Sequence, residues 1–188
     1  ANTTVIAAAL RPWQGVISAD TGHINVHETG AIEATGHKVI ALPNKDGKIA
    51  AEQIDACCRE HFSAGNAEHM VQPGMVYVSN PTEYGTLYTK TELESIRKVC
   101  SEYDLILFVD GARMAYGLGA DGNDLTLADY AAISDVFYIG GTKAGALFGE
   151  AVVITDEQLK KDFRYMIKRQ GGMLAKGRLL GIQYEVLM

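Results

Sequence analysis

The sequence predicts an α/β fold, a three-layer αβα domain built around a mainly parallel sheet. Short apolar segments alternate with longer segments of helical spacing, and several of the apolar segments contain no polar residue. Strands of that kind are buried on both faces, as in a parallel sheet covered by helices. Ligands of such sheets bind beyond the carboxyl ends of the strands. The polar residues of interest fall at those ends: His23, Asn80 to Glu83, Asp110, Arg113 and Thr142-Lys143.

The first half of the chain contains the signals of three helices and three strands. A small apolar run that Pro12 ends is typical of a helix, and Gly36 is a suitable stop for another. The polar run from Asn44 to Gly47 has the composition of a turn. Helices are predicted over 2–10, 28–35 and 51–62, and strands over 15–18, 39–43 and 75–78.

The second half continues the alternation. Residues 91–103 carry apolar side chains on one helical face, and 105–110 form a continuous apolar run that ends in the carboxylate of Asp110. Two further apolar runs, 136–140 and 151–154, are close enough in sequence to form antiparallel neighbours. Helix is predicted from Asp156 onward.

Composition limits the possible partners and the compartment. The 188 residues are 47% hydrophobic and 21% charged, with a net charge of −6, which argues against nucleic acid as a partner. No apolar run approaches the roughly 20 residues of a membrane span, and no signal peptide is visible. The three cysteines form neither a disulfide framework nor a metal motif, so Cys57 or Cys58 is expected to be buried on a helix and Cys100 to pack near a helix end. Together these features predict a cytoplasmic protein.

Two residues stand out as candidates for chemistry. Asp110 ends a buried strand, where a carboxylate is costly unless a cation meets it; an N-cap or an ion pair with Arg113 would also explain it. Lys143 lies among glycines between two predicted strands, where a partly desolvated lysine becomes a nucleophile; a solvated surface turn is the alternative. Together they suggest an acid that keeps a pyridine nitrogen protonated and a lysine that binds an aldehyde.

Almost the whole chain resembles the threonine aldolase and β-eliminating lyase family of fold-type-I enzymes, which depend on pyridoxal 5′-phosphate (PLP). Each motif is weak alone, but their order and spacing are specific. The resemblance rests on Thr21-Gly22-His23-Ile24, Glu28-Thr29-Gly30, Pro81-Thr82-Glu83-Tyr84-Gly85, Asp110-Gly111-Ala112-Arg113, Thr142-Lys143 and Gly171-Gly172-Met173.

The resemblance implies a role for each site residue. Lys143 would form the Schiff base with PLP, and Asp110 would face the pyridine nitrogen. His23 would stack on the ring, Arg113 would bind the substrate α-carboxylate with both guanidinium arms, and Thr142 would donate to the phosphate. An ordinary loop position would equally explain His23. Positive charge near the phosphate could also come from Lys168, Arg169 or Lys176. A solvated helix face would equally explain these three residues.

The chain departs from the family at one position. Threonine aldolases commonly carry Thr-His-Asn where this chain has Thr82-Glu83-Tyr84, and that His is a candidate base for the β-hydroxyl proton. Glu83 could replace it if burial raised its pKa, or it could be a salt-bridge partner of His23. The substitution leaves threonine itself in doubt as the substrate.

The expected function is PLP-dependent aldol cleavage of a β-hydroxy-α-amino acid, threonine-like, to glycine and an aldehyde. The alternatives are PLP-dependent β-elimination or transamination of another amino acid, and a catalytically silent binding module; a nucleotide-binding module lacks its glycine-rich phosphate motifs here. The resemblance implies a homodimer or homotetramer. Residues 1–188 are expected to be the PLP-binding large domain, a segment without the upstream Gly-Thr phosphate turn and the C-terminal small domain.

Overall fold

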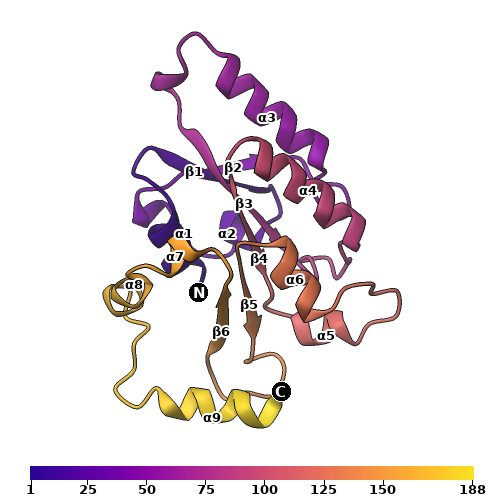
Figure 1. Ribbon diagram of the computed structural model, residues 1–188, viewed down its shortest axis with the longest axis vertical. Helices are drawn as coiled ribbons and strands as arrows, with labels where there is room; N and C mark the ends of the chain where they lie inside the picture. The colour runs from indigo at the N-terminus through magenta and orange to yellow at the C-terminus, as the bar shows by residue number, and fades with distance from the viewer.

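A computed structural model describes residues 1–188, and a six-stranded sheet lies at its centre (Figure 1). The order is β2-β1-β3-β4-β5-β6, in which the first five strands are parallel and β6 runs antiparallel to β5. The predicted fold class is therefore confirmed, including the antiparallel pair. The strands are β1 (Gln14–Ala19), β2 (Val39–Leu42), β3 (Gln72–Ser79), β4 (Ile106–Asp110), β5 (Val136–Gly140) and β6 (Glu150–Ile154).

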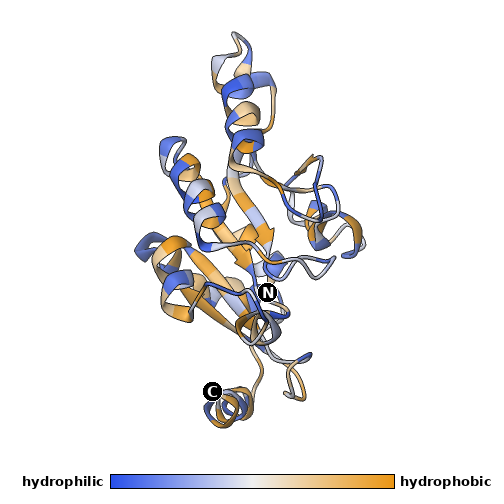
Figure 2. Cartoon of the chain, turned by 90° about the vertical axis from the view of Figure 1, so that its right-hand side faces the viewer, coloured by the Kyte–Doolittle hydropathy of each residue, from blue (hydrophilic) through white to orange (hydrophobic).

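Helices cover both faces of the sheet, and the strands between them carry mostly hydrophobic residues (Figure 2). One face packs against α3 (Ala51–Ser63), α4 (Lys90–Glu102) and α6 (Leu127–Ile133). The other packs against α1 (Asn2–Ala9) and α8 (Phe163–Arg169). The shorter or peripheral helices are α2 (His23–Val26), η1 (Glu33–Thr35), η2 (Ala67–His69), α5 (Met114–Leu118), α7 (Glu157–Lys160) and α9 (Arg178–Leu187).

Alternate strand residues build two separate cores. Ile17, Val76 and Leu107 belong to the core beneath α3 and α4, whereas Met75 and Phe108 belong to the core beneath α1. Each of these side chains is completely buried, which contributes about 1.5–3 kcal/mol per residue relative to exposure. Because packing fixes the central strands from both sides, their carboxyl ends are rigid platforms for the turns that follow.

The predicted helix over 28–35 is wrong. Only the 3₁₀ turn at Glu33–Thr35 forms, because Thr29 and Gly30 take left-handed backbone angles with φ of 54° and 71°. Gly36 does end this segment, with φ of 93°, as predicted.

The predicted helix from Asp156 onward is also divided. Asp162 has φ of 60° between α7 and α8, and Gly171 has φ of 78° after α8, so that three helices replace one. The sequence signals did not identify α5 and α6. Cys58 and Cys100 are buried free thiols on α3 and α4, as predicted. None of the helices combines the length and apolarity that crossing a membrane requires.

Candidate active site

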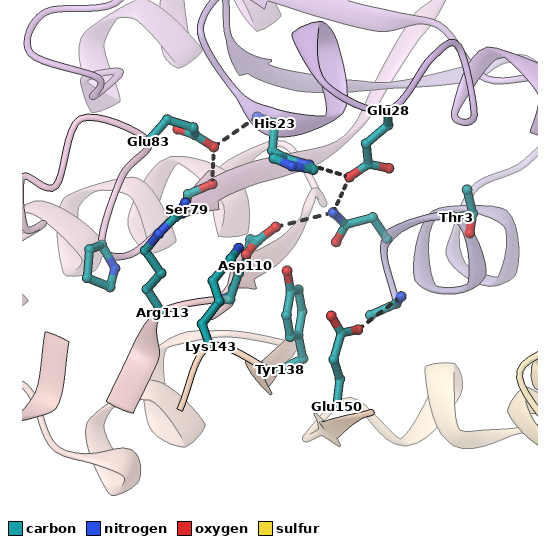
Figure 3. Close-up of a pocket in the computed structure, with 14 residues that line it drawn as sticks. Thr3, His23, Glu28, Ser79, Glu83, Asp110, Arg113, Tyr138, Lys143 and Glu150 are labelled. Carbon is teal, nitrogen blue, oxygen red and sulfur yellow. Dashed lines mark hydrogen bonds and ion pairs between the residues drawn. The ribbon is translucent and has the colours of Figure 1, made fainter. Parts of the chain in front are cut away.

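A cavity of about 180 Å³ opens at the carboxyl ends of β1, β3, β4 and β5, beside the first turn of α1 (Figure 3). The cavity therefore lies at the carboxyl ends of the strands, where the sequence analysis expected a ligand to bind. Its lining is mostly polar and consists of Ala1, Asn2, Thr3, His23, Glu28, Ser79, Pro81, Glu83, Asp110, Ala112, Arg113, Tyr138, Lys143 and Glu150.

Asp110 lies at the floor of the cavity and is 3% exposed. Its Oδ1 accepts from the Ala112 amide at 2.9 Å, and its Oδ2 accepts from Asn2 Nδ2 at 3.2 Å and from the Tyr77 hydroxyl. Three donors therefore fix the position of the carboxylate. Neither alternative explanation is observed, since Asp110 forms no ion pair with Arg113 and Arg113 itself takes the N-cap of α5.

Two tyrosines next to Asp110 remain protonated. Burial raises the pKa of Tyr77 well above its usual range, and the negative charge of Asp110 raises it further. Burial and the same charge also raise the pKa of Tyr138. The Tyr77 hydroxyl is therefore a permanent donor to Asp110.

Close backbone packing joins the Asp110 turn to β5. A Cβ atom on Gly111 would lie 1.9 Å from the carbonyl oxygen of Tyr138, and one on Gly140 would lie 2.6 Å from the carbonyl oxygen of Ala112. Only glycine fits both positions. This contact brings the segment that leads to Lys143 against the strand end that carries Asp110.

Lys143 and Arg113 supply two cations to the cavity, and Figure 3 shows both side chains beside Asp110. The turn that carries Lys143 is exposed, and the Tyr116 hydroxyl donates to the Lys143 carbonyl oxygen at 2.6 Å. Neither cationic group takes part in any ion pair or hydrogen bond of the structure. Both are therefore open to a ligand.

His23 connects two carboxylates. Its ring Nδ1 lies 2.9 Å from Glu28 Oε1, and its backbone amide donates to Glu83 Oε1 at 2.9 Å. The considered salt bridge between His23 and Glu83 is therefore wrong, because the imidazole pairs with Glu28. Asn2 Nδ2 also donates to Glu28 Oε1, at 2.6 Å, and so links Glu28 to Asp110.

The structure brings together five of the six residues singled out from the sequence, namely Lys143, Asp110, His23, Glu83 and Arg113. Thr142 is exposed in the adjacent turn and does not line the cavity. Lys168, Arg169 and Lys176 are likewise exposed and lie outside the lining. Sequence reasoning missed Asn2, Tyr77 and Ser79, and it quoted Glu28 without a role, because their contacts join separate segments of the chain.

One buried atom of the cavity lacks a partner. Asn2 is 8% exposed, and its Oδ1 accepts no hydrogen bond, although its Nδ2 donates to Asp110. A buried acceptor without a donor is destabilising unless a ligand or water meets it. The cavity therefore offers two acceptors on its floor, Asn2 and Asp110, and a free amine on Lys143. The acceptors fit a ligand with an N–H at one end, and the amine fits a carbonyl elsewhere on the same ligand.

The beta-eliminating lyase family model matches residues 1–183. The chain belongs to the beta-eliminating lyase family. The low specificity L-threonine aldolase of Pseudomonas sp. is 31% identical over 193 residues, covering 100% of this chain and 54% of that protein. The low specificity L-threonine aldolase of Pseudomonas aeruginosa is 32% identical, covering 96% of this chain and 51% of that protein. The chain spans about half the length of the curated relatives it matches.

Solved structures are also similar to this chain. The threonine aldolase of Leishmania major superimposes with a TM-score of 0.94 at 54% identity, covering 99% of this chain and 53% of that one. The aspartate aminotransferase of Thermus thermophilus gives 0.67 at 17% identity, over 89% of this chain and 42% of that one. The second match shows a shared fold only. This member of the beta-eliminating lyase family thus has the fold of PLP-dependent transferases.

Proposed function

We propose that this member of the beta-eliminating lyase family is part of a PLP-dependent carbon–carbon lyase, which cleaves a threonine-like β-hydroxy-α-amino acid to glycine and an aldehyde. The observation that carries the proposal is that the free amine of Lys143 and the buried carboxylate of Asp110 line the same cavity. The L-threonine aldolases to which the chain is similar support the reaction type.

The floor and the free amine fit PLP. Asp110 would keep the pyridine nitrogen protonated by accepting its N–H, and the buried Asn2 Oδ1 would be free for a second donor of the bound ligand. Lys143 would hold the aldehyde carbon through its amine. When bound, PLP supplies an electron sink for the bonds of the substrate's α carbon.

The remaining residues would bind and orient. Arg113 has no protein partner, and its planar guanidinium matches the two oxygens of a substrate α-carboxylate. His23, with its ring held by Glu28, would lie against the cofactor ring. Thr142 would offer its hydroxyl to the phosphate from the turn next to Lys143.

The β-hydroxyl proton needs an acceptor in the cavity, and Glu83 and His23 are the candidates. Glu83 is favoured because its Oε2 has no hydrogen-bond donor in the structure, whereas its Oε1 has two. A base must lie within hydrogen-bond reach of the proton it takes, and a free carboxylate oxygen in the cavity meets that need.

We infer the wider setting from the family. Residues 1–188 would form the PLP-binding large domain, active as a homodimer or homotetramer in the cytoplasm, with a small amino acid as the substrate. Light scattering of the purified protein would give the mass of the assembly, and a monomeric mass would contradict this part of the proposal.

The test is the visible absorbance of the full-length protein with PLP, before and after borohydride reduction. Lys143→Ala should abolish the absorbance of the lysine-bound cofactor, and reduction of the unaltered protein should fix the cofactor on the peptide that contains Lys143. Lys160→Ala is the matched control, since Lys160 is exposed on α7 and pairs only with Glu157. An unchanged spectrum in Lys143→Ala would overturn the proposal. Release of ammonia and a 2-oxoacid, in place of glycine and an aldehyde, would assign elimination instead.

A further inference from the structure

The two oxygens of Glu83 have different environments. Oε1 accepts from the backbone amide of His23 at 2.9 Å and from the hydroxyl of Ser79 at 2.7 Å (Figure 3). Oε2 has no donor. The two donors therefore hold the carboxylate by one oxygen and leave the other available in the cavity.

Ser79 is itself fixed in place. It is the last residue of β3, is 8% exposed, and lies in register with Asp110 of β4. A hydroxyl carries one proton, and the short contact to Glu83 takes it. The second neighbour of the Ser79 hydroxyl, Tyr77, lies 3.4 Å away and donates its own proton to Asp110. Ser79 is thus oriented toward Glu83.

The backbone that carries Glu83 is anchored independently of Ser79. The Thr82 amide donates to the Thr86 carbonyl oxygen at 2.9 Å and closes the loop. The buried Asn80 side chain donates to the Tyr130 hydroxyl at 2.6 Å and accepts from the Tyr88 amide at 3.0 Å. Loss of the Ser79 hydroxyl would therefore leave Glu83 Oε1 with one donor, the His23 amide, and loosen the carboxylate while the loop stays in place.

We propose that Ser79 is a positioning residue, which holds Glu83 Oε1 so that Oε2 receives the β-hydroxyl proton of the substrate. This inference rests on the proposed aldol cleavage. The substrate O–H bond breaks and its proton passes to Oε2, while the O–H electron pair forms the second bond of the aldehyde carbonyl. The electron pair of the broken Cα–Cβ bond stays on the α carbon, which then takes a proton to give glycine. A preorganised carboxylate does this without reorientation at the moment of reaction.

The experiment compares two reactions of the same cofactor-loaded, full-length protein. One is cleavage of a β-hydroxy-α-amino acid, which needs the hydroxyl base, and the other is exchange of the glycine α-hydrogen with deuterated solvent, which does not. Ser79→Ala should lower kcat for cleavage by about tenfold or more, part of the 10²–10⁴-fold that a positioned base contributes, and leave glycine exchange unchanged. Ser79→Thr keeps the hydroxyl and should retain cleavage.

Two further variants complete the design. In a Glu83→Gln background, Ser79→Ala should cause no additional loss, because both changes remove the same function. Ser95→Ala is the matched control, since the Ser95 hydroxyl is exposed on α4 and bonds only to its own helix. Wild-type cleavage rates in Ser79→Ala, equal losses of cleavage and exchange, or additive losses with Glu83→Gln would each overturn the role of Ser79. Absence of both reactions in the unaltered protein would instead overturn the proposed function.

Discussion

The carbonyl oxygen of Tyr138 lies 1.9 Å from the point that a Cβ atom would occupy on Gly111. Tyr138 lies in the middle of β5, and Gly111 directly follows Asp110 at the end of the neighbouring strand β4. A Cβ atom on Gly111 would also lie 2.7 Å from the Met114 side chain. The glycine is therefore a requirement of packing at the site as well as a motif residue.

Replacing Gly111 should be strongly destabilising. Gly111→Ala should lower the free energy of unfolding by about 3 kcal/mol or more, because the methyl group overlaps backbone that cannot move without disturbing β5. Urea unfolding of both proteins measures the change. Gly119→Ala is the control, since a Cβ there meets nothing nearer than 3.7 Å. Equal stabilities of the two variants would show that the contact is not tight.

Neutralising Asp110 should affect chemistry more than cofactor attachment. An Asn cannot keep a pyridine nitrogen charged, so Asp110→Asn should lower kcat/KM by about 10- to 1,000-fold, the equivalent of the 1–3 pKa units that an opposite charge provides. Steady-state kinetics measures the loss, and the lysine-bound absorbance should persist. The exposed Asp121, which forms no ion pair, supplies the Asp121→Asn control. An unaltered kcat/KM would remove Asp110 from the proposed chemistry.

Glu28 should determine which nitrogen of His23 carries the proton. Because Glu28 Oε1 lies 2.9 Å from Nδ1, the neutral imidazole should be protonated on Nδ1, and Nε2 should be free of hydrogen. ¹⁵N NMR of labelled histidine reports the tautomer, and Glu28→Ala should alter the His23 signals. Glu33→Ala, at an exposed acid of η1, should leave them unchanged. An Nε2-protonated His23 in the unaltered protein would contradict the arrangement.

Acid should remove the contribution of one surface pair to stability. The Lys90 ammonium, which donates to Asp129 at 2.7 Å, holds the pKa of that carboxyl well below its usual range, and the Thr126 hydroxyl adds to the effect. A pKa lowered by folding stabilises the protein above the unfolded value, near pH 4, and this stabilisation disappears as pH falls toward the folded pKa.

Asp129→Asn should therefore be less stable than the unaltered protein at neutral pH, and the difference should shrink below about pH 4. Urea unfolding over a pH series measures both curves. Asp121→Asn should show no such pH-dependent difference. A constant gap between Asp129→Asn and the unaltered protein at all pH values would exclude this pair as its origin.

Sequence patterns predicted the sheet well because its signal is local. The apolar runs at 105–109, directly before Asp110, and at 136–140 admit few structures other than buried strands, and both appear as strands. The failed helix over 28–35 shows the limit of spacing alone. Its apolar spacing is helical, but Thr29 and Gly30 take left-handed backbone angles, which the spacing of apolar residues does not reveal.

The candidate site divides in the same way. Asp110 and Lys143 were detectable because their positions after strands place them at one edge of the sheet. Three other residues could not be detected, because each contributes through a contact between segments distant in sequence: Asn2, Ser79 and Tyr77. Tyr77, for example, donates from β3 to Asp110 on the neighbouring strand β4. From sequence alone, a tyrosine inside an apolar strand is interpreted as a core residue, because the neighbouring strand that holds its partner is not known.

The cavity residues occupy only the carboxyl edge of the sheet, and the opposite edge carries none of them. The connection from α3 to η2 lies at that far edge, at the top of Figure 1, and its Gly65 is exposed with open space around it. Exposed tips of this kind tolerate insertions. A purification handle inserted at Gly65 is therefore expected to leave the cavity residues in place.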